Sequence, residues 1–119
     1  MGNRPSTPVA QTLETRILPH LARAARALAI KGFAAEEAAV RGDVCDLLVR
    51  SEAREIEGRI EFRTPADRHG EVHWLYAVSS ANLQPQVTNG VLPGPEKVTE
   101  VIAGFVSVFT TVASFSGEA

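Results

Sequence analysis

Hydrophobic positions in the first part of the chain recur every three or four residues, the spacing of one face of an α-helix. The pattern predicts a helix from Val9 to about Lys31, followed by Gly32 as its C-terminal stop. Pro19 lies inside this segment and predicts a kink or a later helix start. The apolar positions are Val9, Leu13, Ile17, Leu21, Ala24, Ala25 and Leu28.

A similar spacing continues over residues 34–52 and predicts a second helix. Gly42 and Asp43 form the weak point of this segment, where the helix could begin or break. The apolar positions here are Ala35, Ala38, Ala39, Val40, Val44, Leu47 and Leu48.

The period then changes to two, which is typical of half-buried β-strands. Residues 55–63 alternate charged and mostly apolar side chains, and residues 71–79 place Val72, Trp74, Tyr76 and Val78 on one face. A turn at 64–70 joins the two segments, so we predict an antiparallel hairpin. Residues 80–94 contain three turn-forming signals and predict a long loop with a short edge strand at 86–91.

The last apolar segment, residues 98–115, fits either a helix or a strand. Pro95 and Glu96 are typical of a helix start, and a helical stripe follows them. The run VSVFTTV is rich in β-branched residues and leaves the strand alternative open. Period and start signal favour the helix, on which Ala103, Gly104 and Ser107 form a small-residue patch suited to self-association. The stripe consists of Val98, Val101, Ile102, Phe105, Phe109 and Val112.

These elements predict an α+β domain over residues 9–119, preceded by a flexible arm at 1–8 that is rich in Pro, Gly and Ser. It has two N-terminal helices, an antiparallel β-hairpin or three-stranded sheet, and a C-terminal helix packed on the sheet. The element order from residue 34 onward is similar to that of double-stranded-RNA-binding domains, but the segment 95–100 (PEKVTE) lacks their basic run. The expected core contains Ile60, Phe62, Trp74, Tyr76, Phe105 and Phe109.

The charge is unevenly distributed along the chain. The sequence has 12 Lys and Arg against 14 Asp and Glu, a net charge of −2, which is not that of a dedicated nucleic-acid-binding protein. Residues 1–33 nevertheless hold five basic residues and one acid (+4), and the remainder holds seven and thirteen (−6). The first helix therefore carries a basic stripe beside its apolar one, a candidate surface for acidic partners. The stripe consists of Arg16, His20, Arg23, Arg26 and Lys31.

Few residues suggest catalysis or metal binding. His69, Glu71 and His73 are spaced two apart and could present three ligands to Zn²⁺, or they form the solvent face of the hairpin. Cys45 lies next to an apolar stripe, which favours a core residue over a nucleophile. P-loop, G-x-G-x-x-G and G-x-S-x-G motifs do not occur in the sequence, and we expect no cofactor.

By exclusion, the sequence favours a small non-enzymatic adaptor, chaperone or assembly protein that acts through protein surfaces as a homo-oligomer. One alternative is a nucleic-acid-associated accessory protein that uses Arg4 and the basic first helix. Another is a metal-dependent enzyme at His69, Glu71 and His73. The N-terminus lacks a secretory pattern, and the apolar stretch at 101–115 is too short to span a bilayer, so we expect a cytoplasmic protein.

Overall fold

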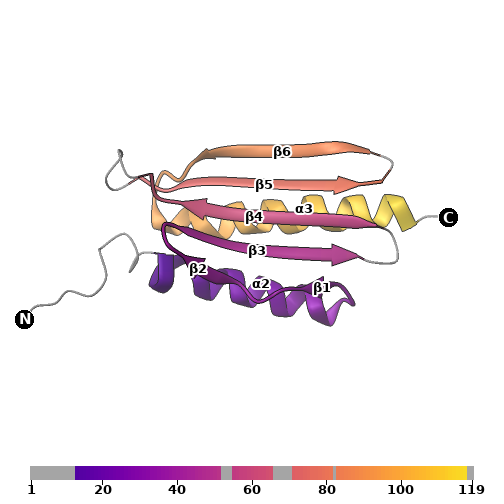
Figure 1. Ribbon diagram of the computed structural model, residues 1–119, viewed down its shortest axis with the longest axis horizontal. Coiled ribbons are helices and arrows are strands. Elements are labelled where there is room, and N and C mark those ends of the chain that lie inside the picture. The colour runs from indigo at the N-terminus through magenta and orange to yellow at the C-terminus, as the bar shows by residue number, and fades with distance from the viewer. Residues whose placement is uncertain (1–12, 52–54, 66–70, 82, 118–119) are drawn as a thin grey trace, which may run out of the picture.

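One antiparallel sheet organises the chain, and two helices lie against one of its faces (Figure 1). The computed structural model describes residues 13–51, 55–65, 71–81 and 83–117. The elements are η1 (Leu13–Ile17), α2 (Leu18–Ile30), β1 (Ala34–Ala35), β2 (Ala39–Arg41), β3 (Val44–Ser51), β4 (Ile56–Arg63), β5 (His73–Ser80), β6 (Leu83–Val91), η3 (Pro95–Lys97) and α3 (Val98–Gly117).

The strand order is simple because each long strand pairs with the next in the chain. β3, β4, β5 and β6 follow one another across the sheet, and the short strands β1 and β2 both pair with the outer side of β3. All pairings are antiparallel. The sheet therefore has one edge made of two short strands and one edge made of β6.

The predicted N-terminal helix is confirmed from Leu13 onward. A π-helical turn, η1, leads into α2, and Pro19 falls in the first turn of α2, where a missing N–H costs little. The helix ends as predicted at Gly32, whose φ of 98° is one that glycine adopts without strain. Its buried side chains include Leu13, Ile17, Leu21 and Leu28. The predicted arm at 1–8 lies outside the described residues.

The second predicted helix, over 34–52, is wrong. The described residues of this segment form β1, β2 and β3 instead. Burial in β3 alternates strictly, with Cys45, Leu47 and Val49 buried and their neighbours half-buried or exposed. Gly42 and Asp43, the weak point of the supposed helix, are the turn between β2 and β3, and Gly42 has a φ of 63°.

The sheet is also larger than predicted, with six strands rather than two or three. The predicted strands at 55–63 and 71–79 are confirmed as β4 and β5, and the edge strand at 86–91 extends to become β6. In the part of the chain that the structure describes, one helical segment, not two, precedes the sheet. The comparison with double-stranded-RNA-binding domains therefore fails, because the element that should be their first helix is made of strands.

The C-terminal segment is a helix, α3, which packs on β4 and β5. Gly58 permits this close packing, since a Cβ atom there would lie 2.6 Å from Cδ1 of Phe109. Phe105 and Phe109 are fully buried with Ile60 and Phe62. Tyr76 is also in the core, and half-buried Trp74 stacks on it at 5.6 Å between ring centroids. Within the described residues, no helix combines the length and the apolar character needed to cross a membrane.

Candidate interaction surface

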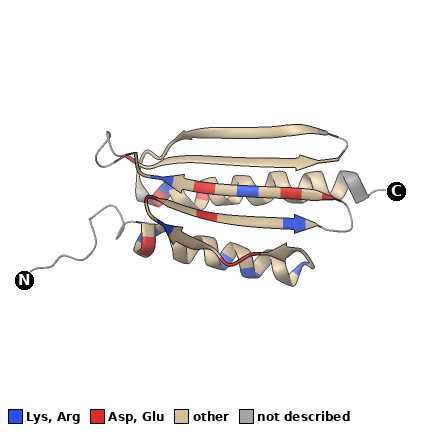
Figure 2. Ribbon diagram, viewed as in Figure 1, with Lys and Arg blue, Asp and Glu red and all other residues tan. Residues whose placement is uncertain are grey.

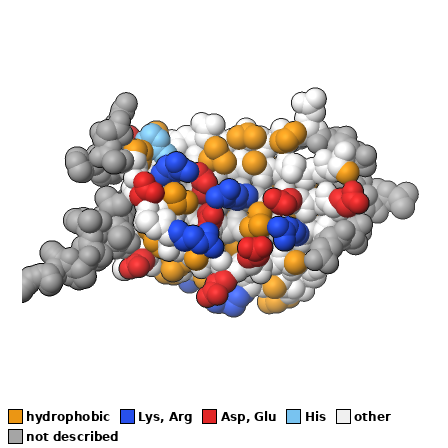
Figure 3. Space-filling model, in the orientation of Figure 1, with side chains coloured by type: hydrophobic (Ala, Val, Ile, Leu, Met, Phe, Trp, Pro, Cys, Tyr) orange, Lys and Arg blue, Asp and Glu red, His pale blue; other side chains and the backbone are white. Residues whose placement is uncertain are grey.

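No helix or strand among the described residues covers the face of the sheet turned away from α2 and α3, and we call it the open face (Figure 1). α2 packs on β1 and β3, and α3 packs on β4 and β5, all from the other side. Side chains alternate along a strand, so every second residue of β3, β4 and β5 points to the open face. Charged side chains gather over the part of this face formed by β2, β3 and β4 (Figures 2 and 3).

These side chains form two neighbouring groups of ion pairs, which we together call the charged band. Asp46 and Glu61 lie directly opposite each other in the pairing of β3 with β4. Arg59 bridges this like-charge pair and offsets part of its repulsion, because its Nη2 lies 2.9 Å from Asp46 Oδ2 and 3.4 Å from Glu61 Oε1. The band consists of Arg41, Asp46, Arg50, Glu57, Arg59, Glu61 and Arg63.

Two more arginines extend the network at its ends. Arg41 Nη1 lies 3.2 Å from Asp46 Oδ1, and Arg63 Nη2 lies 3.1 Å from Glu61 Oε2. The two acids are largely covered, with 16% and 14% of their side chains exposed, whereas the three arginines expose 52–69%. The outer surface of this five-residue network therefore consists mainly of guanidinium groups.

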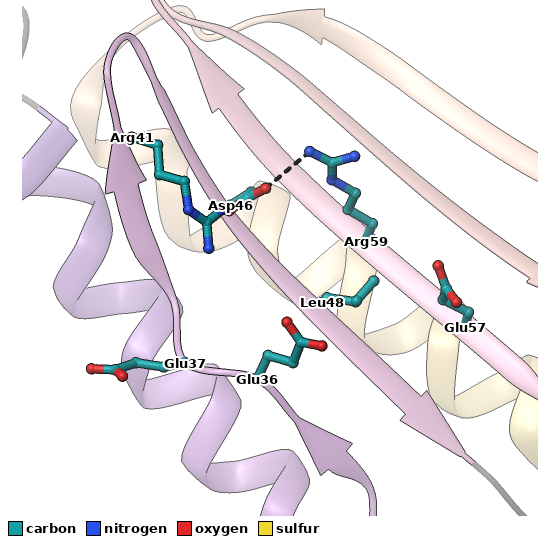
Figure 4. Close-up of a pocket in the computed structure, with 7 residues that line it drawn as sticks. All are labelled: Glu36, Glu37, Arg41, Asp46, Leu48, Glu57 and Arg59. Carbon is teal, nitrogen blue, oxygen red and sulfur yellow. Dashed lines mark hydrogen bonds and ion pairs between the residues drawn. The ribbon is translucent and has the colours of Figure 1, made fainter.

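The other end of the charged band is acidic. Nη1 of Arg50 lies 3.6 Å from Oε2 of Glu36, and Nε of Arg50 lies 3.5 Å from Oε1 of Glu57. The side chains of both acids are more than half exposed. A shallow hollow of about 210 Å³ lies between the two ends, and half-buried Leu48 contributes to its lining (Figure 4). Its other lining residues are Glu36, Glu37, Arg41, Asp46, Glu57 and Arg59. The open face thus changes from positive to negative along β3 and β4.

Next to the charged band lies a neutral band on β5 and β6. The register places Leu75 opposite Glu61 and Ala77 opposite Arg59, so both share the open face with the charged residues. No Lys, Arg, Asp or Glu occurs in residues 73–91, so β5 and β6 carry no blue or red in Figure 2. The neutral band consists of Leu75, Ala77, Ser79, Val87, Asn89 and Val91.

A second hollow, of about 460 Å³, crosses the junction of the two bands. Glu61 and Arg63 line its charged side, and Leu75 and Val91 line its apolar side. The junction therefore offers hydrogen-bonding and apolar contacts within one shallow depression, as protein-binding surfaces commonly do.

The predicted basic stripe begins on η1, continues along α2 and ends at Lys31, the residue directly after α2. Arg16, Arg23, Arg26 and Lys31 are exposed, and His20 is half-buried. Within the part of the chain that the structure describes, none of the four exposed cations forms an ion pair with an acid. Four of the five side chains of the stripe are therefore accessible to a partner, and the binding role of the stripe stays a prediction.

The predicted metal ligands are only partly described. His73 Nε2 lies 2.9 Å from Glu71 Oε1, so these two side chains contact each other. His69 lies outside the described residues. Across the described ranges no three His, Cys, Asp or Glu side chains come close enough together to hold a metal ion. The three-ligand site that includes His69 stays a prediction.

Cys45 is fully buried on the helix-covered side of β3, as the core interpretation predicts. Burial, with a further contribution from the charge of Asp46, raises the pKa of its thiol to about 12. The thiol is therefore protonated at neutral pH, a poor state for a nucleophile.

The small-residue patch on α3 divides between two environments. Gly104 faces the sheet, where a Cβ atom would lie 2.9 Å from the hydroxyl oxygen of Tyr76. Ala103 and Ser107 are exposed. Gly104 thus serves packing within the chain, and self-association through the two exposed residues stays a prediction.

Sequence reasoning did not find the open face, because it assigned residues 34–52 to a helix. The signal was present in the alternation of Asp46, Leu48 and Arg50 with three buried neighbours.

No protein-family model matches this chain, and no curated protein and no solved structure is significantly similar to it.

Proposed function

We propose that this protein is a non-enzymatic adaptor, chaperone or assembly protein that binds a protein partner through the open face and works as a homo-oligomer. The observation that carries the proposal is the open face itself. Six strands present a surface that no described element covers, and on it a charged band and a neutral band lie side by side. Both helices pack on the opposite side, so this surface is available to a partner.

The charged band suits a partner that carries carboxylates. Arg41, Arg59 and Arg63 are the outermost groups of their network, and each guanidinium has more donors than its ion pair occupies. Asp46 and Glu61 hold these side chains in place before binding. A partner therefore meets arginines that have already lost part of their rotamer freedom, which lowers the entropic cost of association.

The neutral band supplies the apolar contact that such an interface needs. Val87 and Val91 expose 55% and 51% of their surface, and Leu75 is half-buried beside them. Interfaces commonly combine an apolar centre with arginine contacts at its border. The arrangement on the open face follows this pattern across the junction of the two bands.

A second candidate function is association with nucleic acid through the basic stripe. It is favoured by one observation, the four exposed cations that form no ion pair among the described residues. Such binding would fall steeply with rising ionic strength, because phosphate contacts release counterions. Replacing both Arg16 and Arg23 by Glu would then abolish it.

A matched pair of double variants separates the two candidates. Arg41→Ala with Arg63→Ala removes two exposed arginines from the open face and leaves Arg59 bridging both acids. Arg16→Ala with Arg23→Ala removes the same charge from the helix. Each full-length tagged protein is used to capture partners from lysate of its own cells, once with and once without nuclease treatment, and the captured proteins are quantified by mass spectrometry.

We expect the open-face variant to retain about tenfold less of the captured partner, and the helix variant to retain it within about twofold. The opposite result, with capture lost in the helix variant and sensitive to nuclease, would support the nucleic-acid function. Equal retention by both variants would count against the open face as the binding surface.

A further inference from the structure

The outer edge of β6 carries backbone groups that no described strand pairs. β6 has nine residues and pairs with β5 on one side only. The amide of Leu92, directly after β6, donates to the carbonyl of Val72 at 2.7 Å, so it points toward the β5 side. Backbone groups alternate along a strand, so those of Val87, Asn89 and Val91 point outward.

The two edges of the sheet differ in their protection against pairing with another chain. The edge beyond β3 consists of strands of two and three residues, separated by a segment that carries Glu36 and Glu37. Short strands and charges are the usual protection of a sheet edge. β6 has no charged residue, and its Pro85 lies at the bulge near the start of the strand, which leaves 86–91 free of proline.

We propose that β6 pairs antiparallel with β6 of a second copy, about a two-fold axis at Asn89. In this register Asn89 lies opposite Asn89 of the partner subunit, and Val87 lies opposite Val91 of the partner subunit. These residues have the outward-pointing backbone groups, so each opposed pair can exchange two N–H···O bonds. The two exposed valines of each copy then cover each other on the open face.

Several observations favour a second copy as the occupant of this edge. A neutral strand meets its own copy without like-charge repulsion in any symmetric register. The helices do not obstruct the approach, since α3 packs on β4 and β5, and Gln86 and Thr88 on the helix side of β6 are exposed. Two-fold pairing also closes the edge, which limits the assembly to a dimer.

Pairing would join the two open faces into one surface. The neutral bands of both copies would meet at the centre, with a charged band on each side. This inference rests on the homo-oligomeric part of the proposed function, and it assigns the surface through which the oligomer forms.

The test places a charge at the two-fold axis. Asn89→Lys and Asn89→Asp each put like charges opposite each other in the dimer, and Asn89 is exposed, so the fold of the monomer is preserved. Sedimentation equilibrium of the purified full chain, up to about 200 µM, measures the dimer dissociation constant. We expect a dimer for the unaltered chain and about fivefold weaker self-association for each variant alone.

Mixing the two variants should restore dimerisation, because Lys then faces Asp across the axis. Gln86→Lys is the matched control, since it adds the same charge to the same strand on the helix side and outside the paired segment. We expect it to dimerise within about twofold of the unaltered chain. Loss of dimerisation in this control, or no rescue in the mixture, would contradict the proposed register.

A purified chain that stays monomeric would overturn self-pairing and leave the edge to a strand of another protein. This outcome is distinct from failure of the proposed function. Partner capture that depends on Arg41 and Arg63 can persist in a monomer, and a dimer with the expected register can form in a chain whose open face captures nothing.

Discussion

Neighbouring residues of β3 experience opposite environments. Cys45 is buried among core side chains, whereas Asp46 lies on the open face between two arginines. The roles of single residues were correctly predicted where they depend on local backbone conformation. Gly32 follows the end of the first helix, and Pro19 lies in the first turn of α2. The environment of Cys45 was also correct, although the element was wrong, because a small apolar residue beside other apolar residues is buried in a strand as well as in a helix.

The thiol of Cys45 should be inert in the folded protein. Its raised pKa, about 12, keeps it protonated at pH 8, and burial blocks access of reagents. We expect labelling by a disulfide reagent at pH 8 to be at least about a hundredfold slower in the native protein than in guanidinium chloride, as followed by absorbance. Native labelling at the denatured rate would show an exposed thiolate and reopen the nucleophile interpretation.

At the scale of elements, patterns confined to one segment predicted well. The alternation of residues 55–63 and the helical stripe of 98–115 each use a single period over their full length, and both were confirmed. The prediction of a helix over residues 34–52 was wrong because three strands follow one another there within a few residues. Val40 and Val44 lie on different strands. The β2–β3 turn happens to place them four residues apart, which is also the spacing of one face of a helix.

The β2–β3 turn provides a test of this corrected assignment. Gly42 has a φ of 63°, and a Cβ atom added there meets nothing within 4 Å, so a substitution would act through backbone strain alone. We expect Gly42→Val to lower the free energy of unfolding by about 1–2 kcal/mol, because β-branched residues disfavour positive φ. Gly42→Asn should cost clearly less than Gly42→Val, because Asn adopts positive φ more readily than β-branched residues do.

Urea unfolding of both Gly42 variants, followed by circular dichroism, measures the two changes. Had residues 34–52 formed a helix, asparagine and valine would cost similar amounts at this position, since their helix propensities are close. Equal destabilisation by the two substitutions would therefore contradict the hairpin.

At the scale of the molecule, the fold is asymmetric in both its layers and its charge. The described helices both lie on one face, and the open face divides into a charged band and a neutral band. This arrangement could not be predicted from the sequence, because it depends on the pairing of β3 with β4. That pairing brings Asp46 beside Arg59 and Glu61, which local periodicity does not link to it.

The two helices pack against each other, and an aromatic contact lies beside this packing. Phe33, just after α2, packs edge-on against Phe109 of α3 at 5.0 Å between ring centroids and an angle of 84°. α2 covers β1 and β3 while α3 covers β4 and β5, so this contact joins the two halves of the helical layer. If the contact between Phe33 and Phe109 couples the two halves of the helical layer, the chain should unfold as one unit.

Trp74 is the one tryptophan of the sequence, and it stacks on Tyr76 under α3, so its fluorescence reports the α3 half. We expect its urea transition to coincide with that of circular dichroism, which reports all elements. Phe33→Ala should lower the unfolding free energy by about 2–3 kcal/mol on both probes, and Phe33→Leu, which keeps apolar volume, by less than about 1.5 kcal/mol. If Phe33→Ala shifts the circular dichroism transition and leaves that of Trp74 in place, the halves unfold separately, and the coupling assigned to Phe33 and Phe109 is wrong.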